Sequence, residues 1–271
     1  MLARFAHLVS PDLGAYVVGE IAAPSTMVDR ITPATTDADR TGIAEETGLV
    51  DAWPVVTEPF SQWVVEDHFP SGRPALETVG AEMVADVRPY EEMKLRLLNG
   101  AHSALAYLGL LAGLETVADA ISDPAFGGFI AALMHDSADT LRVPARAERA
   151  RYAASLIARF GNAALHHRLA QIATDGSQKL PQRILGTIRD RLAGGLPIAR
   201  HALVVAAWMR FVAGTDDRGR ALVLADPLAA ELKRIVAAGP RPRSAGERPH
   251  GRAGHLRPRL ARRRAFHQRR P

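Results

Sequence analysis

Four residues whose side chains can exchange or hold a proton lie in one short stretch that follows Pro89. Asn99 follows Lys94 after five positions, His102 follows after three more, and Glu91 precedes the lysine by three. At about 100° per residue, all four fall within about 140° of one another around a helix. Burying such groups is costly unless they hydrogen-bond to each other, to water or to a substrate. The chemistry that uses this set is the interconversion of an alcohol and a carbonyl.

Each group suits one part of that chemistry. A desolvated lysine can lower its pKa enough to exchange a proton near neutral pH, which an arginine cannot do. The amide of Asn99 can donate to a developing oxyanion, and His102 can hold a neighbouring hydroxyl. On spacing alone a structural interpretation competes, in which Lys94 extends along the surface, Asn99 belongs to a local kink and His102 is a hydrogen-bonded core residue.

The K-x4-N-x2-H pattern resembles that of the polyol-specific long-chain dehydrogenase/reductases, the mannitol dehydrogenase family. Three further stretches are similar to the same family and occur in the same order: residues 24–33 (PSTMVDRITP), 58–67 (EPFSQWVVED) and 171–183 (QIATDGSQKLPQR). The resemblance runs from about residue 1 to 236.

The resemblance implies a metal-independent oxidoreductase that uses NAD or NADP and acts on a sugar alcohol and its ketose, or on a hexuronate. It implies that Lys94 is the general acid/base, that Asn99 stabilises the alkoxide and that His102 positions the substrate. Glu91 matches a glutamate linked in some members to proton exchange with solvent. Mannitol/fructose, arabinitol/xylulose and fructuronate/mannonate all remain open as substrate pairs.

Three further residues are candidates for the substrate or cofactor cleft. Mannitol 2-dehydrogenases carry a second oxyanion-hole asparagine before the first matching stretch, and the nearest residue here is the shorter Ser25. Asp29 is either a wall of the site or the partner of Arg30 in a structural ion pair. Lys179 either reaches the cleft or lies in a segment that caps a helix.

Metal chemistry finds little support in the sequence. His135-Asp136 resembles the paired ligands of metal phosphohydrolases but lacks their partner motifs. His166 and His167 are adjacent, so on a helix they point about 100° apart. The chain has no cysteine, which excludes disulfides, thiolate metal sites and cysteine nucleophiles. We therefore expect no metal site and a reducing compartment, with the cytoplasm as the default.

The rest of the sequence predicts a mostly α-helical fold. Beyond Pro74 the apolar spacing is helical almost throughout, broken by prolines and glycines into about seven or eight helices. β-Branched and aromatic residues predict one or two short strands near 53–65. The nearly uncharged stretch 101–114 is too short to cross a membrane, so it is expected to be a central buried helix, and no membrane partner is expected.

The domain organisation follows from this pattern. Residues 1–238 resemble the helical C-terminal domain of the family, with 1–50 as a linker or lead-in segment and 239–271 as a separate tail. No G-x-G-x-x-G turn follows a strand, and strands and helices do not alternate. We therefore expect that the Rossmann half and its cofactor-binding domain are absent and that only the C-terminal half of the family is present.

Such a chain is expected to be inactive by itself, because catalysis requires the nicotinamide positioned against the substrate. It would be a truncated remnant, or a mis-delimited reading frame, of a longer dehydrogenase. A degenerate gene product with no retained activity is a further possibility.

Charge is concentrated at the C-terminus. Residues 240–271 hold eleven arginines against one glutamate, a net charge of +10, whereas the whole chain carries +5. This arginine- and proline-rich tail is expected to be disordered. It is either a translation of GC-rich DNA out of frame, which we favour, or an arm that binds nucleic acid. The alternative function is thus a non-enzymatic helical module with a nucleic-acid-binding tail.

Overall fold

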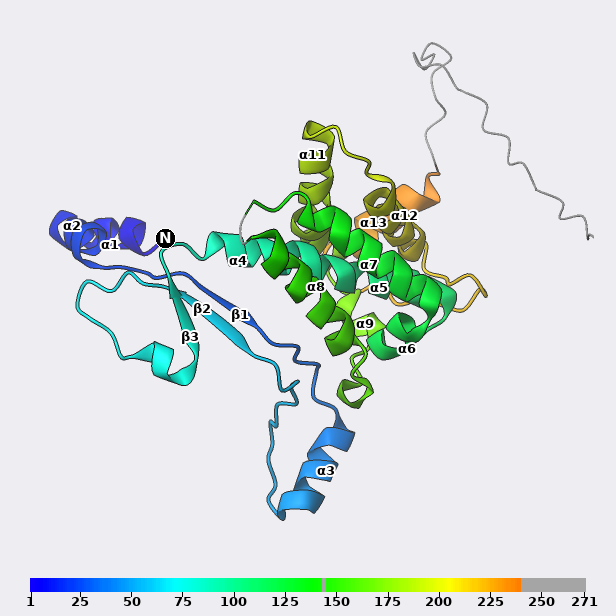
Figure 1. Ribbon diagram of the computed structural model, residues 1–271, viewed down its shortest axis with the longest axis horizontal. Helices are drawn as coiled ribbons and strands as arrows, with labels where there is room; N and C mark the ends of the chain where they lie inside the picture. The colour runs from blue at the N-terminus through cyan, green and yellow to red at the C-terminus, as the bar shows by residue number, and fades with distance from the viewer. Residues whose placement is uncertain (143–144, 240–271) are drawn as a thin grey trace, which may run out of the picture.

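The computed structural model describes residues 1–142 and 145–239. Nearly all of the predicted basic tail, from residue 240 onward, lies outside the described residues. The molecule has a part built on a small sheet, a helical hairpin beside it, and a helical body that holds most of the core (Figure 1). Within the described residues, no helix is both long and apolar enough to cross a membrane.

The chain begins with a helical hairpin, α1 (Leu2–Val9) and α2 (Pro11–Glu20). This segment was expected to be part of a linker or lead-in, but it forms two helices that Ser10 divides. Its side chain accepts a hydrogen bond from the backbone N–H of Leu13, and a proline follows it at the first helical position.

The sheet has three short strands in the order β1-β2-β3. β1 (Thr26–Asp29) runs antiparallel to β2 (Gln62–Glu66), and β2 runs parallel to β3 (Ala81–Val84). A 3₁₀ turn, η1 (Leu76–Val79), lies in the crossover between β2 and β3. The connection between β1 and β2 carries α3 (Asp37–Thr47), which projects away from the molecule (Figure 1).

The prediction of strands only near 53–65 needs correction. β2 begins at residue 62, the stretch before it is irregular, and β1 and β3 were missed. β1 ends in an aspartate and β3 contains alanine and glutamate, residue types that are depleted in strands. Tertiary contacts that a local pattern cannot reveal hold these strands in place.

The helical body follows the sheet and is nearly all helix, as the sequence predicted. Its elements are α4 (Arg88–Met93), η2 (Lys94–Asn99), α5 (Gly100–Ala112), α6 (Val117–Ser122), α7 (Pro124–Ala138), α8 (Arg146–Phe160), η3 (Ala163–Leu165), α9 (Leu169–Ile172), α10 (Gly176–Leu180), η4 (Pro181–Leu185), α11 (Gly186–Ala193), α12 (Ala199–Val212) and α13 (Ala229–Ala237). The prediction of a central buried helix is confirmed: α5 is buried along most of its length and packs against α6, α7, α9 and α12.

Two of these elements are π-helical turns that interrupt longer helices. α4, η2 and α5 follow one another without a break, and within η2 the bonding shifts so that the N–H of Gly100 donates to the carbonyl of Leu95, five residues back. The run from α10 through η4 to α11 has the same form, with Gly186 donating to Pro181. The two π turns pack together. π turns inside α-helices are frequent at functional sites.

Candidate active site

Three of the residues singled out from the sequence line one pocket. Lys94, Asn99 and Glu91 face a pocket of about 420 Å³. β1 supplies part of the opposite wall, and the remaining lining residues are Thr26, Met27, Val28, Leu95 and Gln182. The pocket therefore lies where the first π turn meets the edge of the sheet.

The π turn explains why Lys94 and Asn99 share this pocket. On a regular α-helix they would lie about 140° apart. In a π turn the backbone bonds join residues five positions apart, so the side chains of such residues stack over one another. The angles drawn from a regular helix were wrong across this stretch for that reason.

The side chain of Lys94 contacts the backbone of β1. Its Nζ donates a short hydrogen bond to the carbonyl oxygen of Val28. Burial lowers the pKa of Lys94, the carboxylate of Asp29 opposes this effect, and the positive charges of Arg159 and Arg183 add to it. The lowered pKa brings the amine closer to the neutral form, which can accept a proton.

Asn99 keeps its hydrogen-bonding capacity. It lies at the end of the π turn, and within the described part of the chain no hydrogen bond of its side-chain amide is found. An amide directed at a pocket beside an amine can donate to an oxygen bound there.

His102 lies behind the pocket and does not line it. The side chain is buried, its ring centroid is 4.6 Å from that of Phe160, and it meets His167 edge to face at 5.2 Å. Its Nε2 is buried and has no hydrogen-bond partner among the described residues. Burial holds the pKa of His102 well below its usual range, and nearby positive charges lower it further, so the ring is neutral at pH 7.

Asp29 forms a buried ion pair, but its partner is Arg159 of α8 and not the neighbouring Arg30. The Arg159 guanidinium donates to both carboxylate oxygens of Asp29 at 2.9 and 2.8 Å and to both of Glu58 at 3.0 and 2.7 Å. Tyr152 donates to Asp29 at 2.7 Å, and Glu58 accepts from the N–H of Ile31 at 2.7 Å. Sequence reasoning missed Arg159, although Glu58 lies in a stretch that resembles the family.

Ser25 and Lys179 stand apart from the pocket lining. Ser25 is exposed, and its backbone N–H donates to Glu66 at 3.1 Å. Lys179 donates to the hydroxyl of Thr174 at 2.9 Å and lies 3.8 Å from a carboxylate oxygen of Asp175. Burial lowers the pKa of Lys179, and the charge of Arg183 lowers it further.

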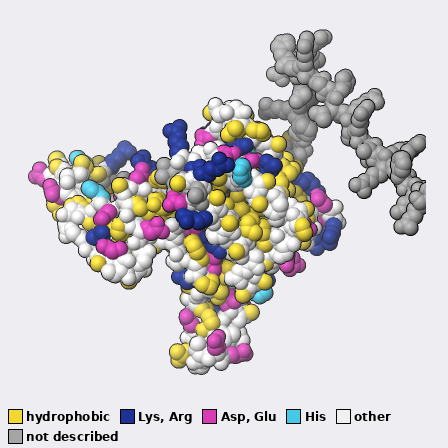
Figure 2. All heavy atoms as spheres, in the orientation of Figure 1, with side chains coloured by type: hydrophobic (Ala, Val, Ile, Leu, Met, Phe, Trp, Pro, Cys, Tyr) yellow, Lys and Arg dark blue, Asp and Glu magenta, His cyan; other side chains and the backbone are white. Residues whose placement is uncertain are grey.

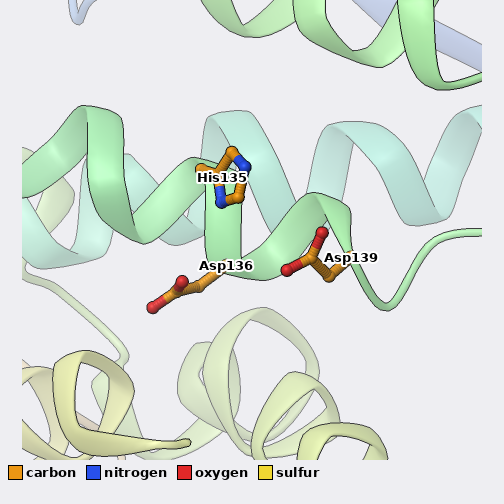
Figure 3. Close-up of side chains that lie close together, drawn as sticks. All are labelled: His135, Asp136 and Asp139. Atoms are coloured by element: carbon orange, nitrogen blue, oxygen red, sulfur yellow. The ribbon is translucent and has the colours of Figure 1, made fainter. Parts of the chain in front are cut away.

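One group of possible metal ligands occurs among the described residues, on the last turn of α7 and at the residue that follows it (Figure 3). Ligand atoms of His135, Asp136 and Asp139 lie within 4.8 Å of one another. Arginines already engage both carboxylates: Arg200 lies 2.6 Å from Asp136, and Arg191 lies 3.6 Å from Asp139. The group is an ion-pair cluster that ties α7 to α11 and α12.

A larger cavity, of about 950 Å³, lies away from Lys94 between α4, α7 and α11. Its lining alternates acids with arginines, and Arg96 pairs there with Asp190 at 2.6 Å. Because these charges neutralise each other, we assign no chemistry to this cavity.

Two family profiles match this chain, one in its N-terminal part and one in its C-terminal part. The profile of the mannitol dehydrogenase C-terminal domain matches residues 86–247, and that of the mannitol dehydrogenase Rossmann domain matches residues 2–78. The prediction that the Rossmann half is absent is therefore wrong, as is the restriction to the C-terminal half. The glycine-rich turn is only one part of a Rossmann domain. Its absence from the sequence therefore did not show that the other parts of the domain were absent too.

Relatives with known names support the same assignment. The chain is 48% identical over 228 residues to D-mannonate oxidoreductase of Escherichia coli, covering 84% of this chain and 47% of that protein. It is 42% identical over 244 residues to mannitol 2-dehydrogenase of Aspergillus fumigatus, covering 88% and 48%. The chain thus spans about half the length of these relatives.

Solved structures agree with the sequence comparisons. The ternary complex of Pseudomonas fluorescens mannitol 2-dehydrogenase with NAD and D-mannitol matches with a TM-score of 0.79 at 42% identity, covering 87% of this chain and 48% of that one. A substrate-free D-sorbitol dehydrogenase matches with a TM-score of 0.77 at 34% identity, covering 85% and 48%. With two family profiles, close relatives and a shared fold in agreement, this chain belongs to the mannitol dehydrogenase family.

Proposed function

We propose that this chain takes part in the NAD- or NADP-dependent interconversion of a secondary alcohol and a ketone in a sugar alcohol or sugar acid, with Lys94 as the general acid/base. The observation that carries the proposal is the gathering of Lys94, Asn99 and Glu91 on one pocket, with burial lowering the pKa of the lysine. A base with a lowered pKa beside an amide donor suits proton transfer to and from a carbinol oxygen.

In alcohol oxidation, neutral Lys94 accepts the proton of the substrate hydroxyl. The amide of Asn99 donates to the same oxygen and stabilises the negative charge that develops on it. When bound, the nicotinamide cofactor supplies the acceptor for the hydride that leaves the carbinol carbon. Ketone reduction reverses these roles, and protonated Lys94 then donates its proton to the carbonyl oxygen.

The remaining residues support these two. Glu91 lines the same pocket and passes the proton between Lys94 and solvent. Neutral His102 lies behind the pocket and acts on the substrate only through the packing of α5, which carries it beside Asn99. Asp29 anchors β1, whose Val28 carbonyl accepts the hydrogen bond of Lys94, whereas we place Ser25 and Lys179 outside the pocket lining.

The chemistry of the pocket fits the nicotinamide end of the cofactor. Met27, Val28 and Leu95 give it apolar surface beside the polar groups of Lys94 and Asn99. A nicotinamide ring, cationic when oxidised and neutral when reduced, can stack on such surface while its carboxamide meets the polar side. Met27 and Leu95 would hold the ring, and the choice between NAD and NADP stays open.

The names of the relatives suggest the substrate class. One is a D-mannonate oxidoreductase and another is a mannitol 2-dehydrogenase, so a sugar acid and a sugar alcohol are both candidates for this chain. The comparisons do not support the expectation that the chain is inactive.

The test is hydride transfer by the purified chain. NAD⁺ or NADP⁺ is supplied with D-mannitol, D-arabinitol or D-mannonate, and formation of the reduced cofactor is followed by absorbance. We expect turnover by the wild type and none by Lys94→Ala, with the two proteins giving the same circular dichroism spectrum.

The matched control is Lys233→Ala, which removes an exposed lysine on α13. It should keep the wild-type rate. Wild-type rates in Lys94→Ala across the pH range would refute the assignment of Lys94, and a wild type inert with every pair would refute the proposed function.

A further inference from the structure

Arg183, on the second π turn, is a half-buried cation with few partners. The sequence placed it at the end of a stretch that resembles the family but gave it no role. Its one hydrogen bond found within the described residues runs from Nη1 to the hydroxyl of Ser103, at 3.3 Å. A guanidinium has five N–H donors, so most of this group's capacity is unused.

The carboxylates that act with Arg183 on Lys94 and Lys179 are engaged elsewhere. Asp29 is bound by Arg159, Asp175 lies 3.8 Å from Lys179, and Asp226 accepts from the hydroxyl of Ser177 at 2.6 Å. Over the described ranges, no carboxylate comes within ion-pairing distance of Arg183. The guanidinium therefore has no anion to balance its charge.

The surroundings of Arg183 are positive. Its charge lowers the pKa of Lys94, of Lys179 and of His102, so it lies electrostatically close to all three. Burial lowers the pKa of Arg183 as well. A charge buried without a partner is unfavourable, and a cluster of cations worsens this. A bound anion would relieve the imbalance.

The position of Arg183 relates it to the Lys94 pocket. Ser103, which receives its hydrogen bond, lies one helical turn beyond Asn99 on α5, and residues four apart on a helix are about 6 Å apart. Gln182, the residue before Arg183, lines the pocket itself. The guanidinium therefore lies 3.3 Å from a hydroxyl that is itself about one helical turn from Asn99, the group that we propose to bind the reacting oxygen.

We propose that Arg183 binds a carboxylate of the substrate, so that the substrate is a sugar acid and not a neutral sugar alcohol. This inference rests on the proposed function, because it takes the Lys94 pocket as the substrate site. A five- or six-carbon aldonate spans the gap between the two positions. Planar, forked donors match a carboxylate in a bidentate manner, which a lysine does not.

Binding to the whole chain tests the inference without requiring turnover. Isothermal titration compares D-mannonate with D-mannitol on the wild type, Arg183→Met and Arg183→Lys. We expect D-mannonate to bind the wild type more tightly than D-mannitol. Arg183→Met should lose at least about tenfold in D-mannonate affinity and none for D-mannitol, since one charge-assisted hydrogen bond is worth that much. Arg183→Lys should retain an intermediate affinity.

Arg189→Met is the matched control, because Arg189 is exposed on α11. It should bind D-mannonate as the wild type does. Thermal unfolding separates recognition from structure: removing an unbalanced buried charge should leave the melting temperature of Arg183→Met equal to or above that of the wild type, whereas a structural role would lower it.

Three outcomes would overturn the inference. One is equal wild-type affinity for D-mannonate and D-mannitol. Another is that Arg183→Met loses affinity for D-mannonate and for D-mannitol to the same extent. The third is weaker binding of NAD⁺ with D-mannonate binding unchanged, which would assign the guanidinium to a cofactor phosphate. None of these depends on hydride transfer, so failure of the proposed function is recognised separately.

Discussion

The amine of Lys94 is bound to a backbone carbonyl, and not to a carboxylate. The Val28 oxygen is a neutral acceptor, so it orients the amine without fixing a proton on it as an ion pair would. The charges around Lys94 are mixed: Asp29 favours the protonated form, while burial and two arginines disfavour it. The balance leaves the pKa below the ordinary lysine value, as an acid/base that works in both directions requires.

The two directions of the proposed reaction should therefore depend on pH in opposite ways. Alcohol oxidation needs neutral Lys94, so kcat/KM should rise as pH rises through the pKa of Lys94. Ketone reduction needs the protonated form and should fall over the same range. Profiles in both directions, measured on one preparation, check this. Two profiles that rise together, or midpoints above the ordinary lysine pKa, would contradict the assignment.

At the scale of single residues, sequence reasoning could group side chains that lie on one helix. Lys94, Asn99, Glu91 and His102 were grouped because they are near in sequence; the first three line one pocket, whereas His102 lies behind it. It failed for Arg159, which lies 101 residues from Glu58 in sequence. The two side chains meet only because the fold packs α8 against the part around the sheet. Spacing along a helix carries no information about such long-range pairs.

The helices around the site depend on close packing at glycine. Gly176 opens α10, where a Cβ atom would lie 2.4 Å from the indole nitrogen of Trp208 and 2.6 Å from the hydroxyl of Tyr107. These distances are too short for any real side chain, so α10 can approach the core only because the residue is glycine. The sequence showed a glycine after Asp175 but not the two aromatic groups that require it.

Gly176→Ala should therefore destabilise the protein, by about 1–3 kcal/mol, because the added methyl group overpacks the core. Urea unfolding measures the loss. Gly186→Ala is the control, since a Cβ there meets its nearest atom at 3.7 Å and glycine is unfavourable within a helix. Equal stability of the two variants would show that α10 moves aside at little cost.

At the scale of the elements, the helical body could be predicted and the sheet could not. Apolar periodicity located the buried helix α5 because a core-facing pattern repeats along it. β1 and β3 have four residues each, too few for a period-two pattern to emerge, and their pairing partners are distant in sequence. The π turns escaped prediction because a single extra residue leaves no mark in composition.

At the scale of the whole molecule, a buried ion-pair group joins the helical body to the part around the sheet. Arg159 belongs to the helical body, whereas Asp29 and Glu58 belong to the part around the sheet, and all three side chains are nearly inaccessible to solvent. The guanidinium also lies against the ring of Phe60, at 3.9 Å from its centroid. In contrast, the α1–α2 hairpin stands away from the helical body and exposes apolar side chains such as Phe5 and Leu8 (Figure 2).

Arg159→Met should destabilise the protein by about 3–5 kcal/mol, because it leaves two buried carboxylates without their cation. Arg151→Met, which changes an exposed arginine on the same helix, should have little effect. Denaturant unfolding of both variants at neutral pH gives the comparison. If Arg159→Met were as stable as the control, the two parts would not depend on this ion pair.

The first π turn makes the bonding of the backbone part of what defines the site. Lys94 and Asn99 are five residues apart, and they face one pocket only while the hydrogen bonds of this turn run five residues back. If the same residues formed a regular α turn, every reactive group would be kept, and the amine and the amide would still point about 140° apart. The bonding pattern of this turn therefore matters as much as the side chains that it carries.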